Sequence, residues 1–130
     1  EEAAFVDVGD QHWNSVFKAM EAVVHSPRGT AQSIRRGLKY RMAGKTGTAQ
    51  VVGIAQGEEY DSEALAERQR DHALFVAFAP IDDPKIAVAV IVDNGEKSST
   101  SAKIARKVID YYLDAQAAKA EVSSIVGVFP

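Results

Sequence analysis

At residues 41–52 the chain reads Arg41-Met42-Ala43-Gly44-Lys45-Thr46-Gly47-Thr48-Ala49-Gln50-Val51-Val52. The Thr and Val residues favour a β-strand, which we predict from Arg41 or Met42 to Gly53. At its centre a Lys-Thr-Gly triad is followed by a second Thr, at residues 45–48. We therefore take this strand as the reference for both the fold and the function.

Two further strands are predicted downstream, at residues 72–79 and 85–93. They are joined by a turn at residues 80–84 that contains two prolines and two aspartates. Because this connection is short, we expect the two strands to be antiparallel neighbours in a meander. Residues 86–92 are apolar without alternation, which predicts a central strand covered on both faces.

A helix is predicted on each side of the strands, because apolar residues recur there at three- and four-residue steps. In the first, at residues 12–25, the predicted buried face consists of Trp13, Val16, Phe17, Met20, Val23 and Val24. The second starts between Ser99 and Ser101 and ends near Asp114 or Ala118. Its predicted inward stripe is Ile104, Val108 and Tyr112, with Ile109 and Tyr111 at the margins. This order predicts an α+β fold, an antiparallel sheet covered by helices.

Three other segments carry weaker signals. A short helical turn is expected at residues 33–36, capped by Thr30 and closed by Gly37. Residues 54–70 are polar and acidic, so we expect a long connection with some helix at residues 62–70. Residues 119–130 form a tail to which we assign no element.

The composition is that of an ordinary globular protein and argues against several functional classes. Hydrophobic residues make up 46% and charged residues 25%, and the net charge of −3 gives no basic field for nucleic acid. There is no cysteine, and the three histidines lack metal-ligand spacing. We therefore expect no nucleic-acid partner, no metal and no cofactor. The apolar runs are far shorter than the ~20 residues of a spanning helix.

The Lys-Thr-Gly-Thr strand has the chemical groups that acyl transfer on an extended, anionic substrate requires. Lys45 supplies a cation near a substrate carboxylate, to which the hydroxyls of Thr46 and Thr48 can donate. Gly47 leaves room along the strand, and the backbone N–H of Thr48 can point at a developing oxyanion. Since three residues recur by chance, an ordinary strand start with a solvated lysine is the alternative interpretation of the bare triad.

Three other patterns compete with this interpretation. Gly44-Lys45-Thr46 mimics the end of a P-loop, but Lys39 stands where that motif needs a glycine, so we reject nucleotide binding. Ser15-Val16-Phe17-Lys18 has the Ser-x-x-Lys spacing of a serine nucleophile, but it lies too close to Lys45 to leave room for a Ser-x-Asn lobe. The acidic residues at 58–63 are interpreted as a solvated loop, not as a metal or glycosidase site.

A series of short motifs surrounds the triad. It consists of Gly29-Thr30-Ala31, the triad strand from Gly44 to Val51, Ala66-Glu67-Arg68-Gln69-Arg70-Asp71-His72, Phe75-Val76-Ala77-Phe78-Ala79-Pro80, Pro84 and Asp93-Asn94-Gly95. The series resembles the C-terminal part of the transpeptidase domain of class B penicillin-binding proteins. Its Glu-Arg-x-Arg-Asp-His segment resembles the elongation-specific type, penicillin-binding protein 2. The resemblance covers about residues 13–113.

This resemblance implies a serine-type D-Ala-D-Ala transpeptidase that cross-links peptidoglycan stem peptides through an acyl-enzyme and is acylated by β-lactam antibiotics. Lys45 would bridge to a Ser-x-Asn loop and assist proton transfer. Thr46 and Thr48 would hold the carboxylate of the stem peptide or the β-lactam, and the Thr48 N–H would be one of two oxyanion donors. Arg68, Arg70, Asp71 and His72 would either border the site or form structural ion pairs.

The resemblance also implies a location and partners. The parent protein would lie in the bacterial inner membrane, with its catalytic domain in the periplasm and its anchor outside this chain. Its partners would be stem peptides, β-lactams, the remaining part of the transpeptidase domain and membrane-bound cell-wall elongation proteins that govern cell shape.

The chain departs from the family pattern at the nucleophile. No Ser-x-Asn occurs in its 130 residues, and we find no Ser-x-x-Lys at the start of a buried helix. We therefore expect residues 1–130 to be the C-terminal segment of one transpeptidase domain, inactive alone. It would supply the Lys-Thr-Gly-Thr strand but not the nucleophile. The alternative is a non-catalytic peptidoglycan-binding or scaffold module with the same fold.

Overall fold

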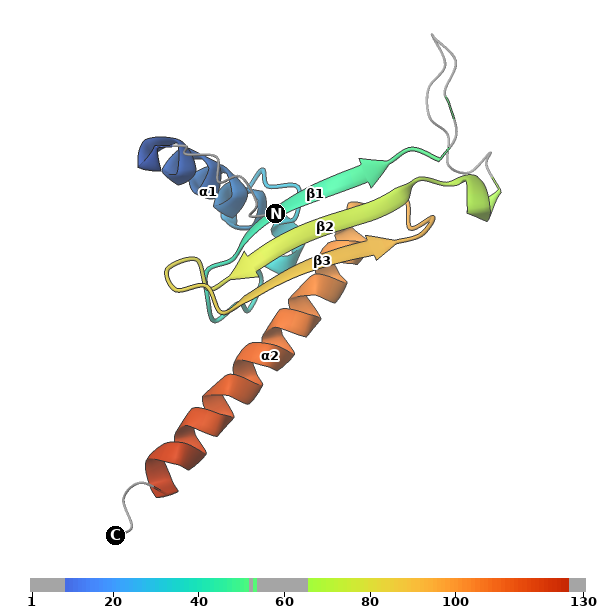
Figure 1. Cartoon of the computed structure of the whole chain (residues 1–130). Helices are drawn as coiled ribbons and strands as arrows, with labels where there is room; N and C mark the ends of the chain where they lie inside the picture. Colours follow the sequence, from blue (N-terminus) through green and yellow to red (C-terminus); the bar gives the residue numbers. More distant parts are fainter. Residues whose placement is uncertain (1–8, 52, 54–65, 127–130) are drawn as a thin grey trace, which may run out of the picture.

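The computed structural model describes residues 9–51, 53 and 66–126, and the statements below concern these residues. Two α-helices and three strands dominate the fold (Figure 1). In chain order the elements are α1 (Asp10–His25), the 3-10 helix η1 (Gln32–Ile34), β1 (Ala43–Ala49), the 3-10 helix η2 (Glu67–Gln69), β2 (His72–Ala79), β3 (Ile86–Val92) and α2 (Ser98–Val126). The α+β class and the helix, strand, strand, strand, helix order are confirmed.

The three strands form an antiparallel meander in the order β1-β2-β3, as predicted. Thr46 lies opposite Phe75, which in turn lies opposite Val90. The prediction that residues 86–92 form a central strand covered on both faces is wrong within the described sheet. There β2 is central, and β3 alternates between half-buried and exposed residues, with Ile91 65% exposed. Within the described residues, the continuous apolarity of β3 is therefore not matched by coverage of both faces.

The core lies between one face of the sheet and α2, which crosses that face (Figure 1). From α2 it takes Ala102, Ala105 and Ile109, all fully buried. The predicted inward stripe is therefore wrong for Ile104 and Val108, which are 42% and 46% exposed, whereas its third member, Tyr112, is half-buried. Small alanine side chains let the helix backbone approach the sheet closely, so the alanine face rather than the bulkier one turns inward.

Helix α1 packs beside β1 and contributes less to the core than predicted. Only Val24 is fully buried, whereas Trp13, Val16 and Phe17 are each more than a third exposed. The rings of Trp13 and Phe17 stack on each other, and Phe17 meets the edge of Phe78 at a centroid distance of 5.5 Å. The predicted buried face is thus wrong for the first half of this helix, whose apolar side is largely open within the described residues.

The remaining segments differ from expectation mainly at their ends. η1 overlaps the predicted turn at Ser33 and Ile34, and no side chain caps it. Gly37, which follows the turn, has a φ of +74°. β1 ends at Ala49 instead of Gly53. The supposed tail is in part helical, because α2 continues to Val126 and runs past the sheet (Figure 1). η2 lies within the predicted connection, and the acidic residues at 58–63 lie outside the described residues.

Candidate active site

All four residues of the Lys-Thr-Gly-Thr motif lie on β1, which pairs only with β2 in the described sheet. Because side chains alternate along a strand, Lys45 and Gly47 belong to one face and Thr46 and Thr48 to the other. Lys45 and Thr48 are exposed, and Thr46 is half-buried. The motif is therefore presented on a sheet edge, where a substrate can reach side chains of both faces and unpaired backbone groups.

The Lys45 side chain lies close to its own strand. Its Nζ donates a hydrogen bond to the carbonyl oxygen of Thr46 at 2.6 Å. Within the described ranges no carboxylate forms an ion pair with this ammonium group, although five other contacts between a Lys or Arg side chain and a carboxylate are present there. An exposed cation held near the strand by a neutral acceptor is available to an anionic ligand.

Two glycines of β1 lie close to β2, and at Gly44 the approach leaves no room for a side chain. A Cβ at Gly44 would lie 2.5 Å from Cζ of Phe75 and 3.1 Å from the carbonyl oxygen of Val76. At Gly47 it would lie 3.3 Å from Cβ of Leu74. Glycine at position 47 therefore helps β1 to pack closely on β2, in addition to leaving the room for substrate that we predicted. Gly44, which the sequence interpretation treated only as part of the motif, brings β1 over the buried Phe75 ring.

Thr46 has a hydroxyl partner from outside the strand. The Oγ1 atoms of Thr30 and Thr46 are 2.9 Å apart, and either can donate. Thr30 belongs to the turn between α1 and η1, where the sequence interpretation made it a helix cap. The structure instead directs its side chain to β1. The sequence signal for this contact was the Gly29-Thr30-Ala31 motif. It formed part of the family resemblance, but no role at the site was assigned to it.

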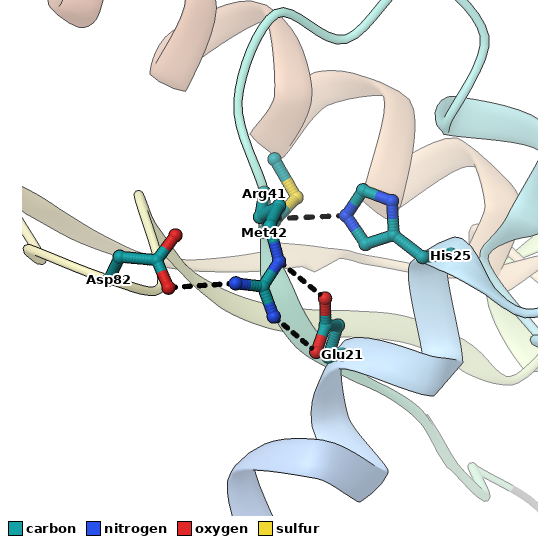
Figure 2. A network of polar contacts seen from close by, with 5 residues as sticks. All are labelled: Glu21, His25, Arg41, Met42 and Asp82. Carbon is teal, nitrogen blue, oxygen red and sulfur yellow. Dashed lines mark hydrogen bonds and ion pairs between the residues drawn. The ribbon is translucent and has the colours of Figure 1, made fainter.

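The start of β1 is fixed by a polar network to two other elements (Figure 2). The Arg41 guanidinium donates from Nε and Nη2 to the two carboxylate oxygens of Glu21 on α1, each at 2.8 Å, and from Nη1 to Asp82 at 2.7 Å. His25 Nε2 accepts the backbone N–H of Met42 at 3.1 Å. The hydrogen bonds from Arg41 lower the pKa of Glu21. The strand therefore enters the sheet in a position set by α1 and the β2–β3 turn.

The basic and acidic residues at the start of β2 form mainly structural contacts. His72 Nδ1 accepts the backbone N–H of Asn94 at 2.9 Å, and the Asn94 side-chain amide donates to the carbonyl of Arg70 at 2.7 Å. Asp71 Oδ1 accepts the N–H of Val51 at 3.3 Å. These bonds connect the start of β2 to the β3–α2 turn and to the chain after β1, which favours the structural alternative for Asp71 and His72. The Arg70 guanidinium lies 4.0 Å from the carboxylate of Glu96. Arg68 lines a hollow with Asp93 and Asn94.

Ser15 is occupied within its own helix. Its Oγ donates to the carbonyl oxygen of Gln11 at 2.9 Å, one turn earlier on α1. A hydroxyl bonded in this way to the helix backbone is a common surface arrangement. This geometry gives no support to Ser15 as a nucleophile.

Two other features, a metal site and a membrane-spanning helix, are absent from the described ranges. No group of three or more His, Cys, Asp or Glu side chains is placed to hold a metal ion there. None of the helices in those ranges combines the length and the apolarity of a membrane-spanning segment.

The chain matches one family model, described as the penicillin binding protein transpeptidase domain, over residues 1–110. Among curated relatives, the peptidoglycan D,D-transpeptidase MrdA of Acinetobacter baumannii is 52% identical over 104 residues, which cover 80% of this chain and 15% of the relative. The MrdA protein of Escherichia coli K12 is 38% identical over 109 residues, which cover 82% of this chain and 17% of the relative.

Solved structures give the same family. Pseudomonas aeruginosa PBP2 in complex with WCK 5153 has a TM-score of 0.68 and 42% identity, over 84% of this chain and 20% of that one. The complex between PBP2 and MreC from Helicobacter pylori gives 0.64 and 28%, over 83% of this chain and 18% of that one. The resemblance to penicillin-binding protein 2 is thus confirmed, and the chain spans a fifth or less of the length of these proteins.

Proposed function

The chain belongs to the penicillin-binding protein transpeptidase family, and from that membership we propose that residues 1–130 form the C-terminal segment of one transpeptidase domain. The remainder of the domain would come from a longer peptidoglycan D,D-transpeptidase. Two observations support this proposal: the small share of each relative that the chain spans, and the absence of Ser-x-Asn from its sequence. The Lys-Thr-Gly-Thr strand would be the contribution of this segment to the active site.

In the proposed reaction, a serine from the remainder of the domain attacks the carbonyl of the D-Ala-D-Ala bond. The bond to the terminal D-Ala breaks, D-Ala leaves with a proton, and an acyl-enzyme forms. An amine of a second stem peptide then attacks the ester, forms the cross-link and returns the proton to the serine. A β-lactam would acylate the same serine by opening of its ring amide, and no second stem peptide would then displace it.

The residues of β1 would act on the substrate side of this reaction. The Thr46 and Thr48 hydroxyls would donate to the substrate carboxylate, and the Thr48 N–H would stabilise the oxyanion. Lys45 would lie between that carboxylate and the Ser-x-Asn loop, where its cation lowers the energy of nearby negative charge. The single observation that carries the proposal is the arrangement of β1, an edge strand with an exposed motif and an anchored start.

The location and partners follow from the same proposal. We place the parent protein in the inner membrane, with this domain in the periplasm and the anchor outside these residues. Stem peptides and β-lactams would bind along β1, because extended ligands can add to a free strand edge. Cell-wall elongation proteins are further proposed partners, supported by the Helicobacter pylori PBP2–MreC complex among the structural neighbours.

The direct test is the rate at which the full-length protein is acylated by a penicillin, followed by intact mass. For Lys45→Ala we expect a fall of about 10²- to 10³-fold, as for removal of an electrostatic group from an acyl-transfer site. Lys18→Ala, on the exposed part of α1, is the matched control and should react at the wild-type rate. An unchanged rate in Lys45→Ala would remove Lys45 from the mechanism.

A second variant, Thr48→Val, should mainly weaken recognition of the substrate carboxylate.

The alternative proposal is a non-catalytic binding or scaffold module, favoured by the missing nucleophile. The coding sequence upstream of residue 1 separates the two proposals. Ser-x-x-Lys and Ser-x-Asn motifs there would exclude the module. If neither motif is present and no penicillin adduct forms on any version of the protein, the enzyme proposal fails.

A further inference from the structure

The segment Gly29-Thr30-Ala31 is fixed against the last turn of α1. A Cβ at Gly29 would lie 2.2 Å from the carbonyl oxygen of Val23 and 2.5 Å from that of Ala22, so only glycine permits this approach. The N–H of Ala31 donates to the Val23 carbonyl at 2.9 Å, and Ala31 is fully buried. Thr30 lies between these two fixed neighbours, so its backbone position is determined by α1.

From that position the Thr30 side chain reaches across to β1. Its hydroxyl oxygen is 2.9 Å from that of Thr46, although sixteen positions separate the two residues in the chain. Each hydroxyl has one proton to donate. If Thr30 donates to Thr46, the proton of Thr46 is free for a ligand, and the first hydrogen bond polarises the second donor. The opposite direction would use the Thr46 proton internally.

We propose that Thr30 is a positioning residue that donates to Thr46 and thereby directs the Thr46 hydroxyl proton toward the substrate carboxylate. This inference rests on the proposed function, because it needs an anionic ligand on this face of β1. Thr30 acts through Thr46 and does not itself touch the substrate. The anchoring of Gly29 and Ala31 gives it the rigidity that such a role requires.

The test uses the full-length protein and the second-order rate constant for acylation by a fluorescent penicillin. Thr30→Val keeps the shape of the side chain and removes the hydroxyl, and we expect a rate about three- to tenfold lower, the usual effect of one hydrogen bond. Thr30→Ser restores the hydroxyl and should return the rate to within about twofold of wild type. Thr100→Val, at an exposed threonine in the first turn of α2, is the control and should react normally.

The double variant separates positioning from a general structural effect. If Thr30 acts through the Thr46 hydroxyl, adding Thr30→Val to Thr46→Val should cause no further loss. A wild-type rate in Thr30→Val, no rescue by Thr30→Ser, or multiplicative losses in the double variant would each overturn the inference. Those results leave the proposed function intact, whereas that function itself fails if the wild-type protein forms no penicillin adduct.

Discussion

The two halves of β1 differ in burial and in the contacts that hold them. Met42, just before the strand, and Ala43 and Gly44 at its start are fully or almost fully buried. Lys45 and Thr48, a few residues further on, are exposed. The first half is held by α1, the β2–β3 turn and the Phe75 ring, and the second half carries the chemical groups of the candidate site.

This difference shows how an exposed edge strand can present side chains in a defined geometry. A strand that is free along its length would vary in position by more than a catalytic site tolerates. Here contacts at the buried end fix the position of β1. Because the strand is rigid, they also fix the position of its exposed end. Substitutions in the two halves should therefore have different effects, on folding in the first and on ligand reaction in the second.

The largest expected effect on stability is at Met42. Met42→Ala removes a fully buried side chain next to Phe75 and Ile34 in the core, and should lower the free energy of unfolding by about 2–5 kcal/mol. Thermal or denaturant unfolding of the full-length protein measures it. Val51→Ala, just beyond the other end of β1 at 39% exposure, is the matched control. Equal losses in the two variants would abolish the distinction between the halves.

Next in size is the effect of Gly44→Ala. The added methyl group would overlap the Phe75 ring, which is fully buried and has little room to move, so we expect a loss of about 1–3 kcal/mol. The matched control is Gly53→Ala, because a Cβ at Gly53 meets nothing within 4 Å. If Gly44→Ala leaves the free energy of unfolding unchanged, β1 packs less closely on β2 than its contacts indicate.

A smaller effect is expected when His25 is replaced. His25→Leu leaves the N–H of the buried Met42 without its acceptor, which should cost about 1 kcal/mol because the half-buried site admits some water. His12→Leu, at an exposed position of the same helix, is the control, again in chemical denaturation. If both variants unfold alike, this hydrogen bond does not anchor the strand.

The smallest effect should come from Glu21, and it should depend on pH. The Arg41 hydrogen bonds hold the pKa of Glu21 below its ordinary value of 4.5. The unfolded chain therefore binds the proton more tightly, and the ion pair contributes its full stability above about pH 4.5 and loses it as the pH falls through the folded-state pKa. Glu21→Gln should be less stable than wild type at pH 7, and the difference should shrink in acid. A gap that stays constant down to pH 3 would contradict this.

The sequence alone predicted the sheet well, because its signals are local. The turn at residues 80–84 and the apolar runs on either side of it predicted β2 and β3 to within one residue of their observed ends. Residues 45–48 lie within the strand that was predicted for them. The sequence did not predict which strand edges are unpaired, because strand pairing depends on the whole domain.

The faces of the helices were predicted less well for a physical reason. Periodicity analysis ranks Ile104 and Val108 above Ala102 and Ala105 as core residues, whereas close helix–sheet packing selects the small side chains. The end of α2 was missed because Val122 is β-branched, while the alanine-rich run before it has high helix propensity and extends the helix. Thr30 was missed as a site residue because its partner is distant in the chain.

The described sheet has two open edges, β1 and β3, and its outer face exposes Val76 and Ile91. Unpaired strand edges beside apolar surface are the templates on which separate chains join into aggregates. A recombinant protein limited to residues 1–130 should therefore collect in inclusion bodies or as soluble multimers. If the chain is part of a larger domain as we propose, other segments of that domain would compete for those edges during folding, and production of the complete domain would be the practical route to biochemical work on this strand.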